Sequence, residues 1–124
     1  MMATESYAAA LPNGATYNQE FTITASGVDF TGCVVRLDVR KTANGDALVS
    51  LSSDGAATEH GSTLAVSAAA DGTLTFRVRL TDEETDALPF DATLYSDVEI
   101  VYPSGDVDRP LRITWTTDGS YTHG

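Results

Sequence analysis

An apolar residue recurs at every second position along most of this chain, and this pattern constrains the fold more than any other feature. The clearest run is TLTFRVRL, whose apolar positions are Leu74, Phe76, Val78 and Leu80. Thr and Arg occupy the positions between them. Because successive side chains of a strand point to opposite faces, this alternation predicts strands with one buried face and one polar face.

Six further segments alternate or nearly alternate in the same way. Together with TLTFRVRL they give seven predicted strands, over residues 21–25, 33–41, 47–52, 62–67, 73–80, 94–102 and 111–115. Dipeptides such as Asn44-Gly45, Asp71-Gly72 and Ser104-Gly105 lie between them and are typical of turns. Short strands at this spacing, with no long helical period, predict an all-β, immunoglobulin-like antiparallel sandwich of about seven strands.

The segment TDEETDALPF, residues 81–90, does not alternate. Thr81 and Glu84 have the spacing of a capping box, and three acids follow Thr81, where a helix dipole favours negative charge. Pro89 ends the segment. We therefore expect one short helical turn near residues 82–88, which carries the chain from one sheet to the other.

The length of 124 residues predicts a single domain. Residues 1–16 are rich in Ala and show no sustained alternation, so we expect an N-terminal arm over 1–16, a sandwich over 17–118 and a C-terminal tail over 119–124. The first residues have neither the basic start nor the apolar run of a signal peptide. No stretch reaches the roughly 18 apolar residues of a membrane span.

The chain carries 18 acidic and seven basic residues, which gives a net charge of −11. Binding to phosphate backbones or to an anionic membrane surface needs clustered Lys and Arg, so nucleic-acid and membrane partners are not expected. The acidity favours solubility, and a specific cationic partner is the alternative.

No residue set predicts catalysis. Cys33 is the only cysteine, which excludes an internal disulfide, and its place in an alternating strand predicts a buried small hydrophobe. A catalytic thiol needs a partnering His, and the two histidines, His60 and His123, lie in a loop and at the chain end. We expect no enzyme activity, no cofactor and no Cys/His metal site. A weak calcium site that uses Asp106 and Asp108 stays open as an alternative.

Charged residues on the polar faces of the strands are the candidates for an interface. The alternation places six of them outward together with Tyr95, which gives the candidates Arg36, Arg40, Arg77, Arg79, Tyr95, Asp97 and Glu99. One interpretation is that the four arginines form cross-strand pairs with Asp38, Asp97 and Glu99, each worth a few tenths of a kcal/mol. The other is a contact surface for another subunit, on which charge fixes the register.

The hairpin over residues 93–115 contributes its other face to the core. We expect its inward residues to be Leu94, Val98, Ile100, Leu111, Ile113 and Trp115. Pro110 cannot donate a backbone hydrogen bond, so it predicts that the last strand lies at a sheet edge.

Four features together resemble a known family. They are Val39-Arg40 at the end of a strand, the Gly-x-Leu-x-Phe-x-Val strand over 72–78, the acidic turn over 81–85, and the hairpin from Tyr95 to Ile113 with its Pro-Ser-Gly turn. These features resemble the N-terminal domain of upper baseplate proteins of tailed bacteriophages, over roughly residues 17 to 116.

The resemblance implies a structural protein of the virion, made in the host cytoplasm and present in several copies in a tail, baseplate or neck. Its partners would be other virion proteins and copies of itself, so that it forms a homo-oligomer in the particle. A capsid decoration protein is one alternative. An immunoglobulin-like adhesion or carbohydrate-binding module is another.

Overall fold

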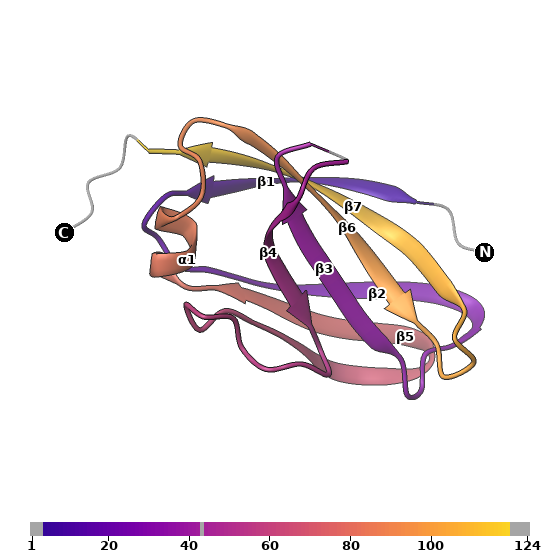
Figure 1. The fold of residues 1–124 in the computed structure, drawn as a ribbon. Coiled ribbons are helices and arrows are strands. Elements are labelled where there is room, and N and C mark those ends of the chain that lie inside the picture. Colours follow the sequence, from indigo (N-terminus) through magenta and orange to yellow (C-terminus); the bar gives the residue numbers. More distant parts are fainter. Residues whose placement is uncertain (1–3, 43, 120–124) are drawn as a thin grey trace.

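Two β-sheets packed face to face make up the computed structural model, which describes residues 4–42 and 44–119 (Figure 1). The first sheet has the order β1 (Glu5–Pro12), β7 (Val107–Asp118), β6 (Thr93–Val101), β3 (Val34–Arg40) and β4 (Ala47–Ser52). The second pairs β2 (Tyr17–Asp29) with β5 (Thr63–Leu80). The predicted all-β sandwich is confirmed.

The long strand β5 turns back on itself at Asp71-Gly72. Gly72 has a φ of 83°, which glycine adopts at little steric cost. Ser67 Oγ donates to the carbonyl oxygen of Thr75 at 3.4 Å, which places the two halves of β5 side by side. The separate strands predicted over 62–67 and 73–80 are therefore the two arms of this hairpin.

The core lies between the sheets and consists of the apolar positions of the alternation. Trp115 is fully buried, its indole N–H donates to Ser96 Oγ at 2.8 Å, and its ring meets Tyr17 edge-on at 5.1 Å. Phe21 of β2 stacks on Phe76 of β5 at 5.5 Å. All but one of the predicted inward hairpin residues are fully buried, and Leu111 is partly buried against the core. Cys33 is buried, as predicted.

The N-terminal arm expected over residues 1–16 is a strand of the first sheet in its described part. β1 pairs with β7 in parallel, from Glu5 opposite Leu111 to Pro12 opposite Asp118. Ala9 and Leu11 are buried in the core, while Ala10 between them and residues 5–8 before them are exposed. Small side chains hid this alternation, because Ala contributes little to a hydrophobic pattern.

Strand β7 is not the edge strand that Pro110 predicted, because it lies between β1 and β6. Pro110 is tolerated for two local reasons. The β6–β7 register shifts between Val98 and Ile100, so the proline sits at an irregularity of the ladder. The pairing with β1 begins only at Leu111, one residue further on.

Helix α1 (Asp82–Asp86) connects β5 of the second sheet to β6 of the first, as the short helical turn near 82–88 was predicted to do. Thr81 is its N-cap, and the Thr81 side chain accepts a hydrogen bond from the Glu84 amide at 3.2 Å. Of the tail predicted over 119–124, residues 120–124 lie outside the described part of the chain.

Candidate functional site

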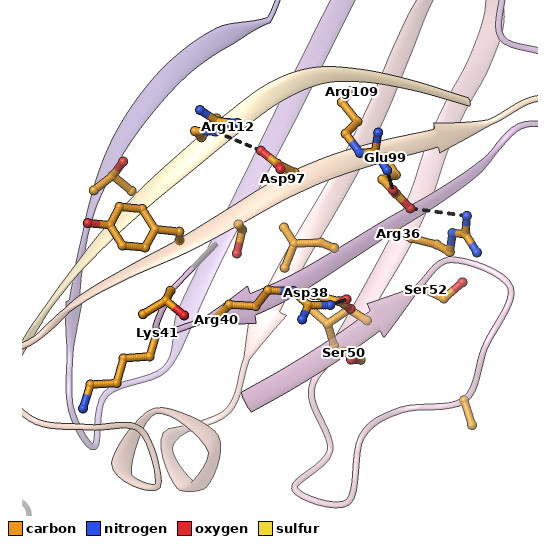
Figure 2. A pocket seen from close by; sticks show the side chains of 17 residues that line it. Arg36, Asp38, Arg40, Lys41, Ser50, Ser52, Asp97, Glu99, Arg109 and Arg112 are labelled. Atoms are coloured by element: carbon orange, nitrogen blue, oxygen red, sulfur yellow. Dashed lines mark hydrogen bonds and ion pairs between the residues drawn. The ribbon is translucent and has the colours of Figure 1, made fainter. Parts of the chain in front are cut away.

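The outer face of the five-stranded sheet gathers charged side chains from the three strands β3, β6 and β7 and from the loop that follows β3. We call it the charged face and define it by Arg36, Asp38, Arg40, Lys41, Tyr95, Asp97, Glu99, Arg109 and Arg112. Figure 2 shows and labels the charged side chains of this set over β3, β6 and β7. They line a concave surface with a volume of about 1250 Å³.

Glu99 is the centre of one ion-pair group on this face. It lies directly opposite Arg36 in the β3–β6 ladder, and its carboxylate is 3.3 Å from the Arg36 guanidinium. The Arg109 guanidinium of β7 approaches the same carboxylate at 2.6 Å (Figure 2). One acid thus links three neighbouring strands.

A second group lies further along the same strands. Asp97 faces Arg112 across the β6–β7 ladder, and the Arg112 Nε donates to Asp97 Oδ1 at 3.0 Å. Arg40 contacts Asp38 of its own strand at 2.6 Å and donates to the Gly45 carbonyl oxygen. Tyr95 lies opposite Arg40 in the ladder and is 41% exposed.

The charged face has a balance of charge opposite to that of the rest of the chain. Five of the seven Lys and Arg residues line it, but only three of the 18 acidic residues do. All of these charged residues lie in the described part of the chain. The face is therefore locally basic in a protein of net charge −11.

The seven candidate residues divide between two opposite faces. Arg36, Arg40, Tyr95, Asp97 and Glu99 come together on the charged face. Arg77 and Arg79 instead lie on the outer face of the β2–β5 sheet, where Arg77 contacts Glu20 at 3.3 Å and Asn18 at 2.8 Å. The expected pairing of Arg77 and Arg79 with Asp38, Asp97 or Glu99 is therefore wrong, because the two sheets separate them.

Three basic residues of the charged face were missed by sequence reasoning. Arg112 alternates with Leu111 and Ile113, so its outward position could have been found from parity alone. The position of Arg109 could not, because the register of the β6–β7 ladder shifts beside it. Lys41 has the inward parity of the strand predicted over 33–41, but β3 ends at Arg40, so Lys41 lies beyond the strand.

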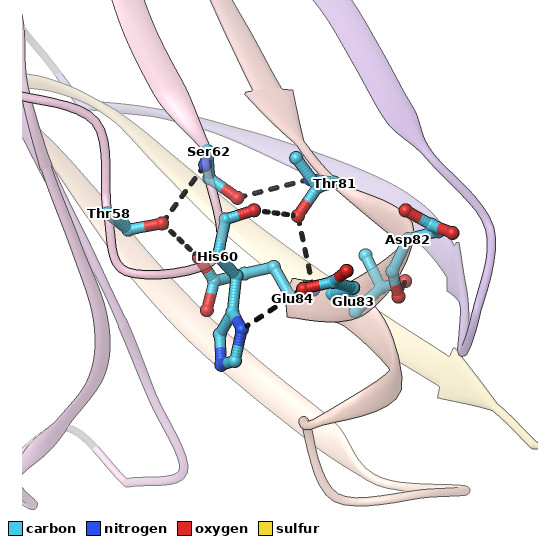
Figure 3. A network of polar contacts seen from close by, with 8 residues as sticks. Thr58, His60, Ser62, Thr81, Asp82, Glu83 and Glu84 are labelled. Carbon is cyan, nitrogen blue, oxygen red and sulfur yellow. Dashed lines mark hydrogen bonds and ion pairs between the residues drawn. The ribbon is translucent and has the colours of Figure 1, made fainter.

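A separate polar network fixes the loop before β5 to α1 (Figure 3). Thr81 Oγ1 donates to the His60 carbonyl oxygen at 2.8 Å, and the Thr81 amide donates to Ser62 Oγ at 3.1 Å. Thr58 Oγ1 donates to the buried carboxylate of Glu84. The predicted capping box is thus only half formed, since Glu84 binds Thr58 and not the Thr81 amide.

Outside this network the helix presents acids to solvent. Asp82, Glu83 and Asp86 are exposed on α1, and Glu59 is exposed in the adjoining loop. The Glu83 side chain is 75% exposed and lies 3.7 Å from the imidazole of His60. We call these four residues the acidic end.

The carboxylates proposed for calcium have other neighbours. Asp108 accepts a hydrogen bond from the Tyr102 hydroxyl at 2.8 Å, and burial together with this contact raises the pKa of Tyr102. Asp106 does not belong to a metal-binding cluster. Across residues 4–42 and 44–119, no group of three or more His, Cys, Asp or Glu side chains is placed to hold a metal ion.

In the same ranges no helix has the length and apolar character to cross a membrane.

Comparison with known proteins supports the fold and nothing finer. No protein-family model matches the chain, and no curated protein matches it. A solved structure reported for site-directed photo-crosslinking of multimeric cell-adhesive interactions of VGSC beta subunits superimposes with a TM-score of 0.55. The match covers 90% of this chain and 91% of the other at 11% sequence identity. The order of the first sheet also fits a variable-type immunoglobulin sheet, so the chain has an immunoglobulin-like fold.

Proposed function

We propose that this protein is a non-enzymatic structural component of a tailed-bacteriophage particle, which assembles with other proteins through the charged face. The observation that carries the proposal is the gathering of five of the seven basic residues on one concave sheet face of an acidic chain. A protein surface with a complementary charge pattern would be steered to this face and held in one register.

The arrangement of charge favours a protein partner over a nucleic acid. Glu99 and Asp97 lie between the arginines and contact them at 2.6–3.3 Å, so the face alternates in sign. A phosphate backbone would meet these carboxylates along with the basic groups, which disfavours binding. A protein surface with acids opposite the arginines and a base opposite the carboxylates avoids that conflict.

The phage setting rests on the resemblance of the hairpin from Tyr95 to Ile113. This same hairpin supplies Tyr95, Asp97, Glu99, Arg109 and Arg112 to the charged face. The partners in this proposal are other virion proteins and further copies of the chain, and the location is the assembled particle.

An adhesion module is the second candidate, favoured by the similar fold of the structure from the VGSC beta-subunit study. In that case the charged face would join proteins on two surfaces and not within one particle. Beads coated with the chain would aggregate if this candidate holds, and the aggregation would require an intact charged face.

Gold-labelled antibody against the chain, applied to phage particles from its source and imaged by electron microscopy, tests the first proposal. Label at the tail end, baseplate or neck supports it, and antibody absorbed with the purified chain serves as control. Label spread over the head would replace the tail role with capsid decoration. Absence of label from every particle, with the chain present in the infected cells, would overturn the virion proposal.

A further inference from the structure

Two regions of this chain have complementary charge and lie on different parts of the molecule. The charged face covers the outside of the five-stranded sheet, whereas the acidic end lies on α1 and its adjoining loop at one end of the sandwich (Figure 1). Since the net charge is −11 and the charged face has more basic than acidic groups, the other surfaces hold the excess of acid.

We propose that the charged face of one copy binds the acidic end of a second copy, so that the chain assembles head to tail. The inference rests on the proposed function, because it names the partner of the same face. An interface between two different patches is heterologous, and repetition of it builds either a closed ring or an open filament. Both suit a part that is present in several copies.

The charges favour this arrangement over a contact between two charged faces. A symmetric contact would bring two locally basic surfaces together, which raises the electrostatic free energy of the pair. The acidic end offers Asp82, Glu83 and Glu59 to the arginines instead. Tyr95, at 41% exposure, adds an aromatic group of the kind that is enriched at binding hot spots.

The two segments that carry the acidic end are also joined by hydrogen bonds, which lowers the backbone entropy lost on binding. Hydrogen bonds from Thr81 to His60 and from Thr58 to Glu84 join α1 to the loop that carries Glu59 (Figure 3). The helix therefore presents its acids in a fixed arrangement.

Overall repulsion between two copies does not prevent the contact. At an ionic strength of about 0.15 M the Debye length is about 8 Å, so charges on the far sides of two copies are largely screened. Charges that touch across the interface are screened much less. We expect association at this ionic strength and weaker association at about 1 M salt, where the Debye length is about 3 Å.

Sedimentation velocity of the full chain over a range of concentrations tests the proposal, with two charge-reversal variants. The face variant carries Lys41→Glu and Arg112→Glu, and the end variant carries Glu59→Lys and Glu83→Lys. We expect wild type to associate reversibly and each variant alone to associate at least about tenfold more weakly. An equal mixture of the two variants should regain association, because each supplies the charge that the other needs.

Regained association also shows that both variants are folded, and their circular dichroism and melting temperature give a second check. The control for net charge is Glu5→Lys with Glu20→Lys, which changes two exposed acids away from the acidic end and should associate like wild type. Association of the end variant at the wild-type level, or a mixture that stays monomeric although both variants are folded, would overturn the proposal.

A wild-type chain that is monomeric at every concentration would also overturn it. That result leaves the proposed function standing if antibody labels the particles, because the charged face would then bind a different virion protein. Conversely, a chain that associates in solution but labels no particle would retain this inference and lose the phage setting.

Discussion

The two outer faces of the sandwich follow the same alternation but carry different chemistry. On the β2–β5 sheet, Thr22 lies opposite Thr75 and Thr24 lies opposite Thr73. We call these four residues the threonine face; the Thr22 and Thr75 hydroxyls are 3.2 Å apart. Glu20, Arg77 and Arg79 lie further along this sheet, whereas on the other sheet Arg, Asp and Glu side chains gather from three neighbouring strands.

Under the proposed function, this difference separates a face that serves the fold from one that binds a partner. Branched Thr side chains suit a pleated surface and need little ordering. Long charged side chains lose more conformational entropy when they are held in place, and exposed ion pairs return little stability. A concave surface that concentrates such groups is therefore better explained by a partner than by the stability of the isolated chain.

The largest effect should come from the core that supports both faces. Trp115→Ala should lower the free energy of unfolding by about 3–5 kcal/mol, because it removes a fully buried ring and the donor to Ser96. Urea unfolding should be followed by circular dichroism, since Trp115 is the only tryptophan. Trp115→Phe should cost less, and a loss below about 1 kcal/mol for the Ala variant would contradict the packing described here.

Removal of an acidic side chain should lower the free energy of unfolding more on the five-stranded sheet than on the β2–β5 sheet. Both losses should be smaller than the loss for Trp115→Ala. Glu99→Ala should cost about 1 kcal/mol, because it leaves Arg36 and Arg109 close together without their shared carboxylate. Glu20→Ala removes only the contact with Arg77 and should cost a few tenths of a kcal/mol. Urea unfolding at low and high salt would measure both, and equal losses would show that the carboxylate shared by Arg36 and Arg109 contributes no more than a single exposed ion pair.

Alternation made most of the sandwich predictable from sequence. The inward positions of the strand from Leu74 to Leu80 and the burial of Trp115 followed from parity, because a strand with one buried face must alternate. The short helix followed from its cap and its acids, which are local signals. Parity cannot say which strands are neighbours, so Arg77 was grouped with Asp97 although the two lie on different sheets.

The remaining features depend on contacts between distant parts of the chain. β1 was missed because its partner β7 lies about a hundred residues away and its own Ala residues carry little hydrophobic signal. The charged face depends on the order β7-β6-β3, which brings Arg109 and Arg36 to one carboxylate. No local pattern encodes that order.

Tyr17, on the inner side of β2, should make stability depend on pH in alkaline solution. Its hydroxyl is buried without a hydrogen-bond partner among the described residues, and burial, with a further contribution from Tyr7, raises the pKa of Tyr17 to about 12. Between pH 10 and 12 the unfolded chain has lost this proton while the folded chain keeps it. Because the unfolded state then binds fewer protons, the free energy of unfolding should fall as pH rises through this range.

Tyr17→Phe should reduce this alkaline loss and change stability at pH 7 by less than about 1 kcal/mol, since no satisfied hydrogen bond is removed. The pKa of Tyr102 is raised as well, so part of the pH dependence should remain until Tyr102→Phe is added. Urea unfolding at intervals from pH 7 to 12 provides the measurement. An unchanged pH profile in the Tyr17 variant would show that its hydroxyl titrates normally.

The smallest expected effects are the coupling energies of single ion pairs, which test whether the ion pairs of the charged face stabilise the fold. Double-mutant cycles should be measured for Arg112 with Asp97 on the charged face and for Arg77 with Glu20 on the other sheet. The side chains are 58% and 40% exposed in the first pair and 47% and 49% in the second, so solvent screens both. We expect each coupling to be a few tenths of a kcal/mol and the two to agree within error.

Agreement would mean that the charged face gains no special stability from its ion pairs, although it holds most of the basic residues. The concentration of charge would then need a cause outside the isolated fold, and a partner supplies one. A coupling above about 1.5 kcal/mol for Arg112 with Asp97 alone would instead make the ion pairs a stabilising network of the fold. The charge asymmetry would in that case be explained without a partner, and the basis of the docking proposal would be lost.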